Sequence, residues 1–213
     1  MRGVTQTADG RSARSARTRE AVVTAVLDLV KNGQVRPTAK EIAARAGISL
    51  RSVYVHFDDL DDLFAAAGAR QAEEVAHLLY AVDASLSLPD RINAVVEQRA
   101  AIWEALAPVR NAVLVWSSSS TTLREGNRRM TQRAVRDLNR LFRAELDAWG
   151  DRRRVALDAL TVAASAGAWD VLRRDQGLSV AKAREVMAAT LTGLLRGPVE
   201  LPALATGFRT GEA

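Results

Sequence analysis

The stretch Thr38-Ala-Lys-Glu-Ile-Ala-Ala-Arg-Ala-Gly-Ile-Ser-Leu-Arg-Ser-Val-Tyr-Val-His-Phe57 decides the fold. Thr38 and Glu41 have the spacing of a capping box, in which two side chains satisfy the free N–H groups at the start of a helix. Ile42 lies on the inner face of this short helix, and Gly47 stands where a tight turn requires a positive φ. The stretch therefore begins with a helix that ends in a turn.

A second short helix follows the turn. Ser49 is placed to cap it, and Val53 and Phe57, four residues apart, point inward. The side chains left to face outward are Leu50, Arg51, Ser52, Tyr54 and His56. Two short helices joined in this way form a helix-turn-helix, whose second helix enters the DNA major groove.

Residues 38–57, with the acidic helix start at 58–64, resemble the DNA-binding domain of TetR-family transcriptional regulators. The matching pattern is Thr38-x-x-Glu-Ile-Ala-x-x-Ala-Gly-Ile-Ser, followed by Val53-Tyr-Val-His-Phe57. The pattern is specific because the turn, the caps, the inward residues and the Tyr-x-His-Phe ending fall at fixed offsets. Close resemblance covers residues 18–65, and beyond them only length and helical pattern agree.

The resemblance implies roles in DNA binding for several of these residues. Tyr54 and His56 match positions that bind phosphates, and Thr38 places a hydroxyl and a helix N-terminus beside the backbone. Arg51 and Ser52 match positions that read base edges, where arginine favours guanine. Alternatively, Arg51 binds phosphate, Tyr54 is a core aromatic and His56 an ordinary surface histidine. The expected DNA-contacting set is Thr38, Leu50, Arg51, Ser52, Tyr54, His56, Arg17 and Arg19.

The segment after the second helix departs from the family pattern. Members commonly carry a phosphate-binding lysine three residues after the Phe, where this chain has Leu60 among four aspartates. One phosphate contact is therefore in doubt. The arginines of the N-terminal arm, above all Arg14, Arg17 and Arg19, could compensate at phosphates or in the minor groove. The alternative is a basic tail that is merely solvated.

The distribution of charge agrees with DNA binding. Residues 1–57 hold ten Lys and Arg against four Asp and Glu, whereas residues 58–213 hold twenty against twenty-one. The excess positive charge therefore belongs to the segment with the helix-turn-helix, as a phosphate-binding module requires.

Composition limits the other possibilities. The chain of 213 residues has 48% hydrophobic residues, enough for a core, and no cysteine, which fits a reducing cytoplasm. No apolar run approaches the ~18 residues that span a bilayer, and the Arg-rich N-terminus lacks the apolar segment of a signal peptide. We therefore expect a cytoplasmic protein with no membrane partner.

Helical periodicity runs through the rest of the chain, without sustained strand alternation. We expect an all-α fold, with an N-terminal three-helix helix-turn-helix head and a larger C-terminal helical body for ligand binding and dimerisation. The expected segments are a disordered basic arm (1–16), the DNA-binding domain (17–60), the body (61–198) and a C-terminal tail (199–213). The expected helices outside the helix-turn-helix are 18–32, 58–82, 89–106, 109–116, 122–149, 152–174 and 179–196.

Two sets of body residues are candidates for sites. The resemblance implies an apolar ligand pocket, for which the candidates are Trp103, Trp116, Met130 and Trp169, although plain core packing also explains them. In the family the last two helices form a four-helix bundle across a two-fold axis. The residues expected at such a dimer seam are the small residues Ala159, Ala163 and Gly167, together with Leu191. The alternative is that these residues belong to ordinary helices of the protomer core.

Nothing in the sequence indicates catalysis, a metal or a cofactor. Glu73 and His77 are four residues apart, but no second His or Cys lies near them in sequence. The serine run 117–120 has no base partner, and no phosphate-cradling glycine motif occurs.

The resemblance implies a homodimeric regulator, most often a repressor in the family. A small molecule of unknown identity is expected to release it from a palindromic operator in double-stranded DNA. Two alternatives stay open. One is a DNA-binding regulator without a small-molecule inducer, controlled by a protein partner or by its own concentration. The other is a helical enzyme with a vestigial head.

Overall fold

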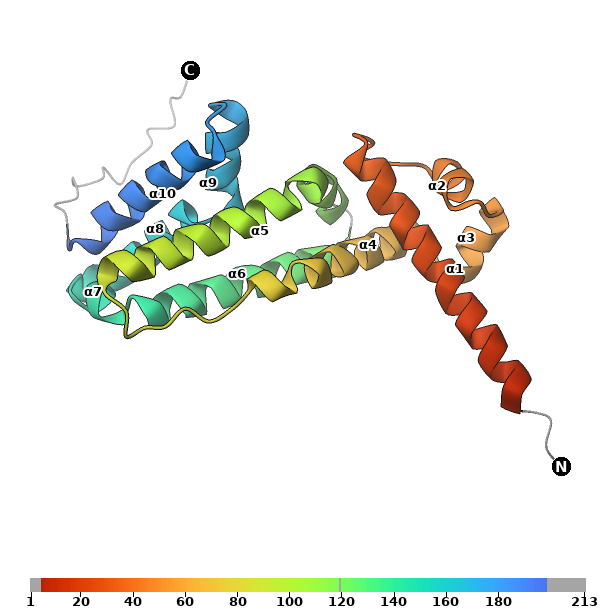
Figure 1. The fold of residues 1–213 in the computed structure, drawn as a ribbon, viewed down its shortest axis with the longest axis horizontal. Helices are drawn as coiled ribbons and strands as arrows, with labels where there is room; N and C mark the ends of the chain where they lie inside the picture. The colour runs from red at the N-terminus through yellow and green to blue at the C-terminus, as the bar shows by residue number, and fades with distance from the viewer. Residues whose placement is uncertain (1–4, 119, 199–213) are drawn as a thin grey trace, which may run out of the picture.

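The computed structural model describes residues 5–118 and 120–198, and all regular structure in these ranges is helical. Helices α1 (Thr5–Lys31), α2 (Ala39–Ala46) and α3 (Leu50–His56) form a head at one end of the molecule (Figure 1). Helix α4 (Leu60–Glu74) connects the head to an elongated body. The body contains α5 (Leu88–Ser117), α6 (Thr121–Leu141), α7 (Arg143–Asp147), α8 (Arg153–Ala163), α9 (Ala166–Asp170) and α10 (Val180–Leu195). The expected all-α fold with a helix-turn-helix head and a helical body is confirmed.

The head is built around a core of inward-facing apolar side chains. Val22 and Val26 of α1, Ile42 of α2, Val53 of α3 and Phe57 each expose at most 2% of their surface. Their spacing along each helix follows the helical period, which is why one face of every helix can be buried. The same core continues into the body, where it includes Val109, Trp116 and Leu123.

Helix α1 is longer than the sequence predicted. It begins at Thr5 instead of near Thr18, so the expectation of a disordered arm is wrong for residues 5–16, and residues 1–4 lie outside the described residues. Extending a helix that packing already holds needs no new nucleus, so these residues can continue α1 although several of them are weak helix formers. The expected C-terminal tail, 199–213, also lies outside the described residues.

Helix α4 is shorter than predicted, because it ends at Glu74 instead of near Val82. A 3-10 turn (Ala76–Leu78) and a non-helical segment, residues 79–87, with a turn at 84–85, follow it. In this segment the carbonyl of Tyr80 accepts a hydrogen bond from Gln98, and the carbonyl of Val82 accepts one from Arg140. These tertiary partners replace the helical ones, and sequence periodicity cannot show them.

Helix α5 is one continuous helix where the sequence predicted two, separated at Pro108. The ring of Pro108 is exposed to solvent, so water can satisfy the carbonyl that the missing N–H leaves free. Trp103 before it and Val109 after it are both buried, and this packing holds the two halves in line.

The remaining boundaries depend on local caps. Ser120, and not Thr122, caps α6, since the hydroxyl of Ser120 accepts a hydrogen bond from the Leu123 N–H. The single helix expected at 122–149 is interrupted at Phe142, and the one expected at 152–174 is interrupted where Ser165 caps α9. A serine that bonds the backbone ahead of it favours a new helix start over continuation. Helix α10, capped by Ser179, agrees with the prediction.

Among the described residues no single helix is long and apolar enough to cross a membrane. One bent pair, Gly150–Ala163 with Ala166–Asp175, meets the requirement in length and composition when both parts are taken together.

Candidate DNA-binding site

The start of α2 is fixed by the expected capping box. The Glu41 N–H donates to Thr38 Oγ1 at 3.3 Å, and the Thr38 N–H donates to Glu41 Oε2 at 2.7 Å. The Thr38 hydroxyl also donates to Glu41 Oε2, and these bonds from Thr38 hold the pKa of Glu41 below its ordinary value. The hydroxyl is thus occupied by the cap, and a phosphate contact at this helix start would fall to the backbone N–H groups.

The turn and the inner face of α3 have the expected geometry. Gly47 adopts a left-handed conformation with φ of 69°, and its N–H bonds the carbonyl of Ala44. The Ser49 hydroxyl accepts from the Ser52 N–H at 3.1 Å and so caps α3. Val53 and Phe57 anchor the helix in the head core. The outer face of α3 is therefore held rigidly at the surface.

The outer face of α3 exposes large apolar and aromatic side chains beside polar ones. Leu50 is 46% exposed and Tyr54 is 51% exposed, so Tyr54 is not a core aromatic. Arg51 is also exposed, whereas Ser52 and His56 are half-buried. An apolar and aromatic face with one arginine suits contact with base edges and with the sugar-phosphate backbone.

Val55 belongs to this face and was missed in the sequence. At 71% exposure it is the most exposed of the large hydrophobic side chains in the described ranges. The signal was present, because Val53 and Phe57 point inward and the helical period then turns residue 55 outward. A valine methyl at this place can contact the methyl group of a thymine.

The two arginines expected beside the DNA lie on α1. The guanidinium of Arg19 lies 4.6 Å from the centroid of the Phe57 ring, next to the end of α3. Arg17 is exposed, and its Nε donates to the carbonyl of Ala13 at 3.3 Å. Both are therefore presented from a helix and not from a loose arm.

Negative charge follows α3 directly. Asp59 caps α4, because its Oδ1 accepts from the Asp62 N–H at 2.8 Å, and Asp58 and Asp62 are exposed. Leu60, at the position of the family lysine, packs against the head core. The start of α4 thus places acids where a phosphate contact was in doubt.

The four candidate ligand residues do not come together in the structure. Trp103 and Trp169 are buried in the body core, where their indole N–H groups donate to the Ala164 carbonyl and to Glu104 Oε1. Trp116 lies instead in the head core, and Met130 is half-buried at the edge of the body core. Core packing thus accounts for the position of all four side chains.

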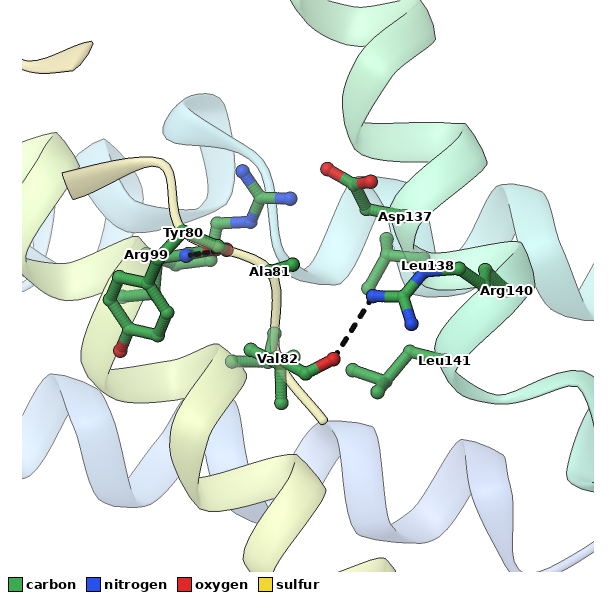
Figure 2. Close-up of a pocket in the computed structure, with 10 residues that line it drawn as sticks. Tyr80, Ala81, Val82, Arg99, Asp137, Leu138, Arg140 and Leu141 are labelled. Atoms are coloured by element: carbon green, nitrogen blue, oxygen red, sulfur yellow. Dashed lines mark hydrogen bonds between the residues drawn. The ribbon is translucent and has the colours of Figure 1, made fainter. Parts of the chain in front are cut away.

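A small hollow lies elsewhere in the body, between residues 80–82, α5 and α6 (Figure 2). Arg99, Gln98 and Val95 of α5 line it on one side, and residues of α6 line it on the other. The α6 residues are Asp137, Leu138, Arg140 and Leu141. Sequence reasoning missed this site, because a buried arginine cannot be recognised from its spacing.

The residues expected at a dimer seam divide into two groups. Ala159 and Ala163 are half-buried and Gly167 is exposed, so they are accessible at the surface of the protomer. Leu191 is 0% exposed in the body core, so its assignment to the seam is wrong. Its apolar character serves the packing of α10 inside the protomer.

Within residues 5–118 and 120–198, no three His, Cys, Asp or Glu side chains are grouped so that they could hold a metal ion.

Comparison with known proteins shows a likeness of fold. The structure is similar to the crystal structure of a transcriptional regulator from Rhodococcus sp. Rha1, with a TM-score of 0.66 and 20% sequence identity over 86% of this chain and 99% of that one. It is also similar to a candidate fatty acid metabolism regulator from Clostridium perfringens, with a TM-score of 0.51 and 16% identity over 85% of this chain and 100% of that one. No family model and no curated protein matches the sequence. The fold of this chain is thus one found in transcriptional regulators, in agreement with the resemblance noted in the sequence.

Proposed function

We propose that this protein is a homodimeric transcriptional regulator of the TetR type, which a small-molecule effector releases from a palindromic operator. The observation that carries DNA binding is the outer face of α3, where Leu50, Tyr54 and Val55 are exposed on a helix that the head core holds in place. Exposed apolar side chains on a rigid helix are typical of a surface with a partner. The positive charge of residues 1–57 agrees with a nucleic-acid partner.

Dimerisation would present two copies of α3 to the DNA. On α8, Val155 is 50% exposed and Val162 is 67% exposed, with the small residues Ala159 and Ala163 between and beside them. This stripe suits close packing of one helix against its copy. Two heads related by a two-fold axis would bind half-sites about one helical turn apart, or somewhat further.

Selection of binding sites from random DNA tests this function, with a palindrome as the expected product. Tyr54→Phe should weaken binding to all sequences alike, because it removes a hydrogen bond to phosphate.

Arg51→Ala should relax the preference at one base position by ~1–3 kcal/mol if Arg51 reads a guanine. Val55→Ala should relax it at a thymine. Failure to enrich any sequence would contradict DNA recognition, and equal loss on every sequence would assign Arg51 to phosphate.

One observation favours the alternative of a regulator without a small-molecule inducer. The indoles of Trp103 and Trp169 are packed and hydrogen-bonded in the body core, where a family-type ligand pocket was expected. The hollow beside Arg99 is what favours an effector.

A further inference from the structure

Arg99 of α5 is a buried charge whose Nε lacks a hydrogen-bond partner in the described part of the chain. The residue is 5% exposed. A guanidinium stays protonated in proteins, and burying a charge without a partner is costly. Burial lowers the pKa of Arg99, while the nearby carboxylate of Asp137 acts in the opposite direction. The fold thus retains a cation where a cation is costly.

Asp137, the acid that lines the same hollow, does not neutralise Arg99. Its carboxylate is 54% exposed and pairs with Arg133 at 3.9 Å. Between the described residues no ion pair within 4.0 Å joins Asp137 to Arg99. Arg140 adds a further positive charge to the lining. The local field is therefore positive, which favours an anion.

The hollow around Arg99 is small and partly open to solvent. Figure 2 shows the guanidinium lying between the segment 80–82 and Asp137 of α6. Val95, Leu138 and Leu141 supply apolar lining. The enclosed volume is about 20 Å³, and the hollow opens to solvent on one side. The enclosed part admits only a group close to the size of a water molecule, so the rest of a ligand must extend outward past the exposed Tyr80.

Residues 79–82, here called the strap, cover this hollow and are tied to both helices that line it. The carbonyls of Leu79, Tyr80 and Val82 accept hydrogen bonds from Arg133, Gln98 and Arg140, at 3.2, 2.7 and 3.0 Å. The strap also continues directly from α4 through the 3-10 turn. A ligand bound at Arg99 would therefore touch α5, α6 and the chain that leads to the head.

We propose that Arg99 anchors a small monocarboxylate with a short apolar body, and that this site receives the effector of the regulator proposed above, on which the inference rests. The planar guanidinium can donate two parallel hydrogen bonds to a carboxylate. Asp137 repels a second negative charge, so a monoanion is preferred to a phosphate dianion. The hydrocarbon part lies at the mouth of the hollow, against the exposed ring of Tyr80.

The test measures binding to the 213-residue chain in the absence of DNA. Benzoate and hexanoate serve as probes, and benzamide and hexanamide are their neutral counterparts. We expect the two acids to raise the melting temperature of the wild-type protein and the amides not to. Arg99→Met should weaken benzoate binding about tenfold or more, since it removes a charged pair of hydrogen bonds. Arg99→Lys should give an intermediate loss of benzoate affinity, because lysine keeps the charge but cannot donate two parallel hydrogen bonds to one carboxylate.

Two further variants separate binding from a structural role. Asp137→Asn should strengthen benzoate binding, because it removes a repelling charge from the site. Arg136→Met, at an exposed position of α6, is the matched control and should change nothing. Without probe, Arg99→Met should melt at the same or a higher temperature, since it removes an uncompensated buried charge. If Arg99 only balances Asp137 inside the fold, Arg99→Met and Asp137→Asn should both melt lower and leave benzoate binding unchanged.

Equal response of the wild-type protein to benzoate and benzamide would overturn the proposal. Operator binding by the same preparation is measured separately. DNA binding without a carboxylate effect refutes this site and leaves the proposed function standing. A carboxylate effect without DNA binding supports the site and refutes the function.

Discussion

The indole ring of Trp116 stacks on the ring of Phe64, with 4.4 Å between the ring centroids and 5° between the planes. Trp116 lies at the end of α5 in the body, and Phe64 lies on α4. The indole Nε1 also donates a hydrogen bond to the Val35 carbonyl, at 3.0 Å, in the connection between α1 and α2. One side chain of the body thus contacts both the linking helix and the head.

Trp116→Phe should therefore loosen the head on the body. The smaller ring can still stack, but the Val35 carbonyl loses a donor, which costs about 0.5–1.5 kcal/mol because Val35 is 36% exposed and water can replace the bond in part. We expect a lower free energy of unfolding in urea and altered operator affinity even without effector. Trp149→Phe is the control, since Trp149 is buried in the body core away from the head. Unchanged operator affinity in Trp116→Phe would show that the contact does not position the head.

The dimer seam can be tested at a residue that the protomer does not need. Val162 is 67% exposed, so Val162→Glu should leave the fold of one protomer intact. A buried glutamate facing its own copy would cost several kcal/mol, and sedimentation should show monomers with weakened operator binding. Leu86→Glu makes the same change at a 41% exposed leucine in the segment after α4, and should stay dimeric. An intact dimer of Val162→Glu would place the interface elsewhere.

The head could be predicted from sequence because its signals are local. The capping box of Thr38 and Glu41, the glycine turn and the inward pair Val53 and Phe57 are all specified within a few residues. The body depends on contacts between distant residues, such as the bond from Gln98 to the Tyr80 carbonyl. Periodicity reports that a side chain is buried, but not which core receives it.

The same limit explains the candidate sites. Trp116 was grouped with Trp103 and Trp169 by residue type, yet it belongs to the head core. Leu191 satisfied the pattern of a seam and of a core equally, and the structure places it in the core. No sequence pattern pointed to Arg99, because what distinguishes this arginine is its burial in the folded protein.

Removing an acid beside α3 should strengthen DNA binding. Asp58 is exposed directly after α3, where its charge repels phosphate. Asp58→Asn should raise affinity for all sequences severalfold at low salt, with a smaller gain at high salt as ions screen the charge. Asp151→Asn, an equal change of net charge at an exposed position in the body, is the control. Equal effects of the two variants would mean that only net charge matters.

The cluster at Glu104 predicts a dependence of stability on pH. Glu104 accepts hydrogen bonds from Arg173 and Trp169, and the bond from Arg173 is the main reason that the pKa of Glu104 lies below its usual 4.5. A lowered pKa in the folded state gives stability that is present above pH 4.5 and is lost as pH falls through the lowered value. The side chain is 34% exposed, so the effect should be below about 1 kcal/mol.

Glu104→Gln tests this dependence, because it keeps the shape but does not titrate. The difference in free energy of unfolding between wild type and variant should be greatest above pH 4.5 and shrink below it. Glu125→Gln, at a residue whose side chain is 71% exposed, should show little difference at any pH. If the difference in free energy of unfolding between wild type and Glu104→Gln does not change with pH, the charge of Glu104 does not contribute to stability.

The close approach of α4 and α6 at Gly68 gives the sharpest test of how the linking helix is held. A Cβ added at Gly68 would lie 2.7 Å from Leu123 Cδ2, and Leu123 is itself buried in the head core. Alanine is normally favoured over glycine inside a helix by about 1 kcal/mol, but here overpacking should reverse the sign and cost about 1–3 kcal/mol. Gly126→Ala is the matched control on α6, where nothing lies within 4 Å, and it should be neutral or stabilising.

The double variant of Gly68→Ala with Leu123→Ala tests whether the two side chains compete for space. Without the Leu123 side chain the clash is gone, so the loss of stability in the double variant should be smaller than the sum of the two single losses. Because α4 carries the head, Gly68→Ala should also shift α3 and weaken operator binding, whereas Gly126→Ala should not. Additive losses in the double variant would show that the Cβ of residue 68 and Leu123 do not compete for the same space.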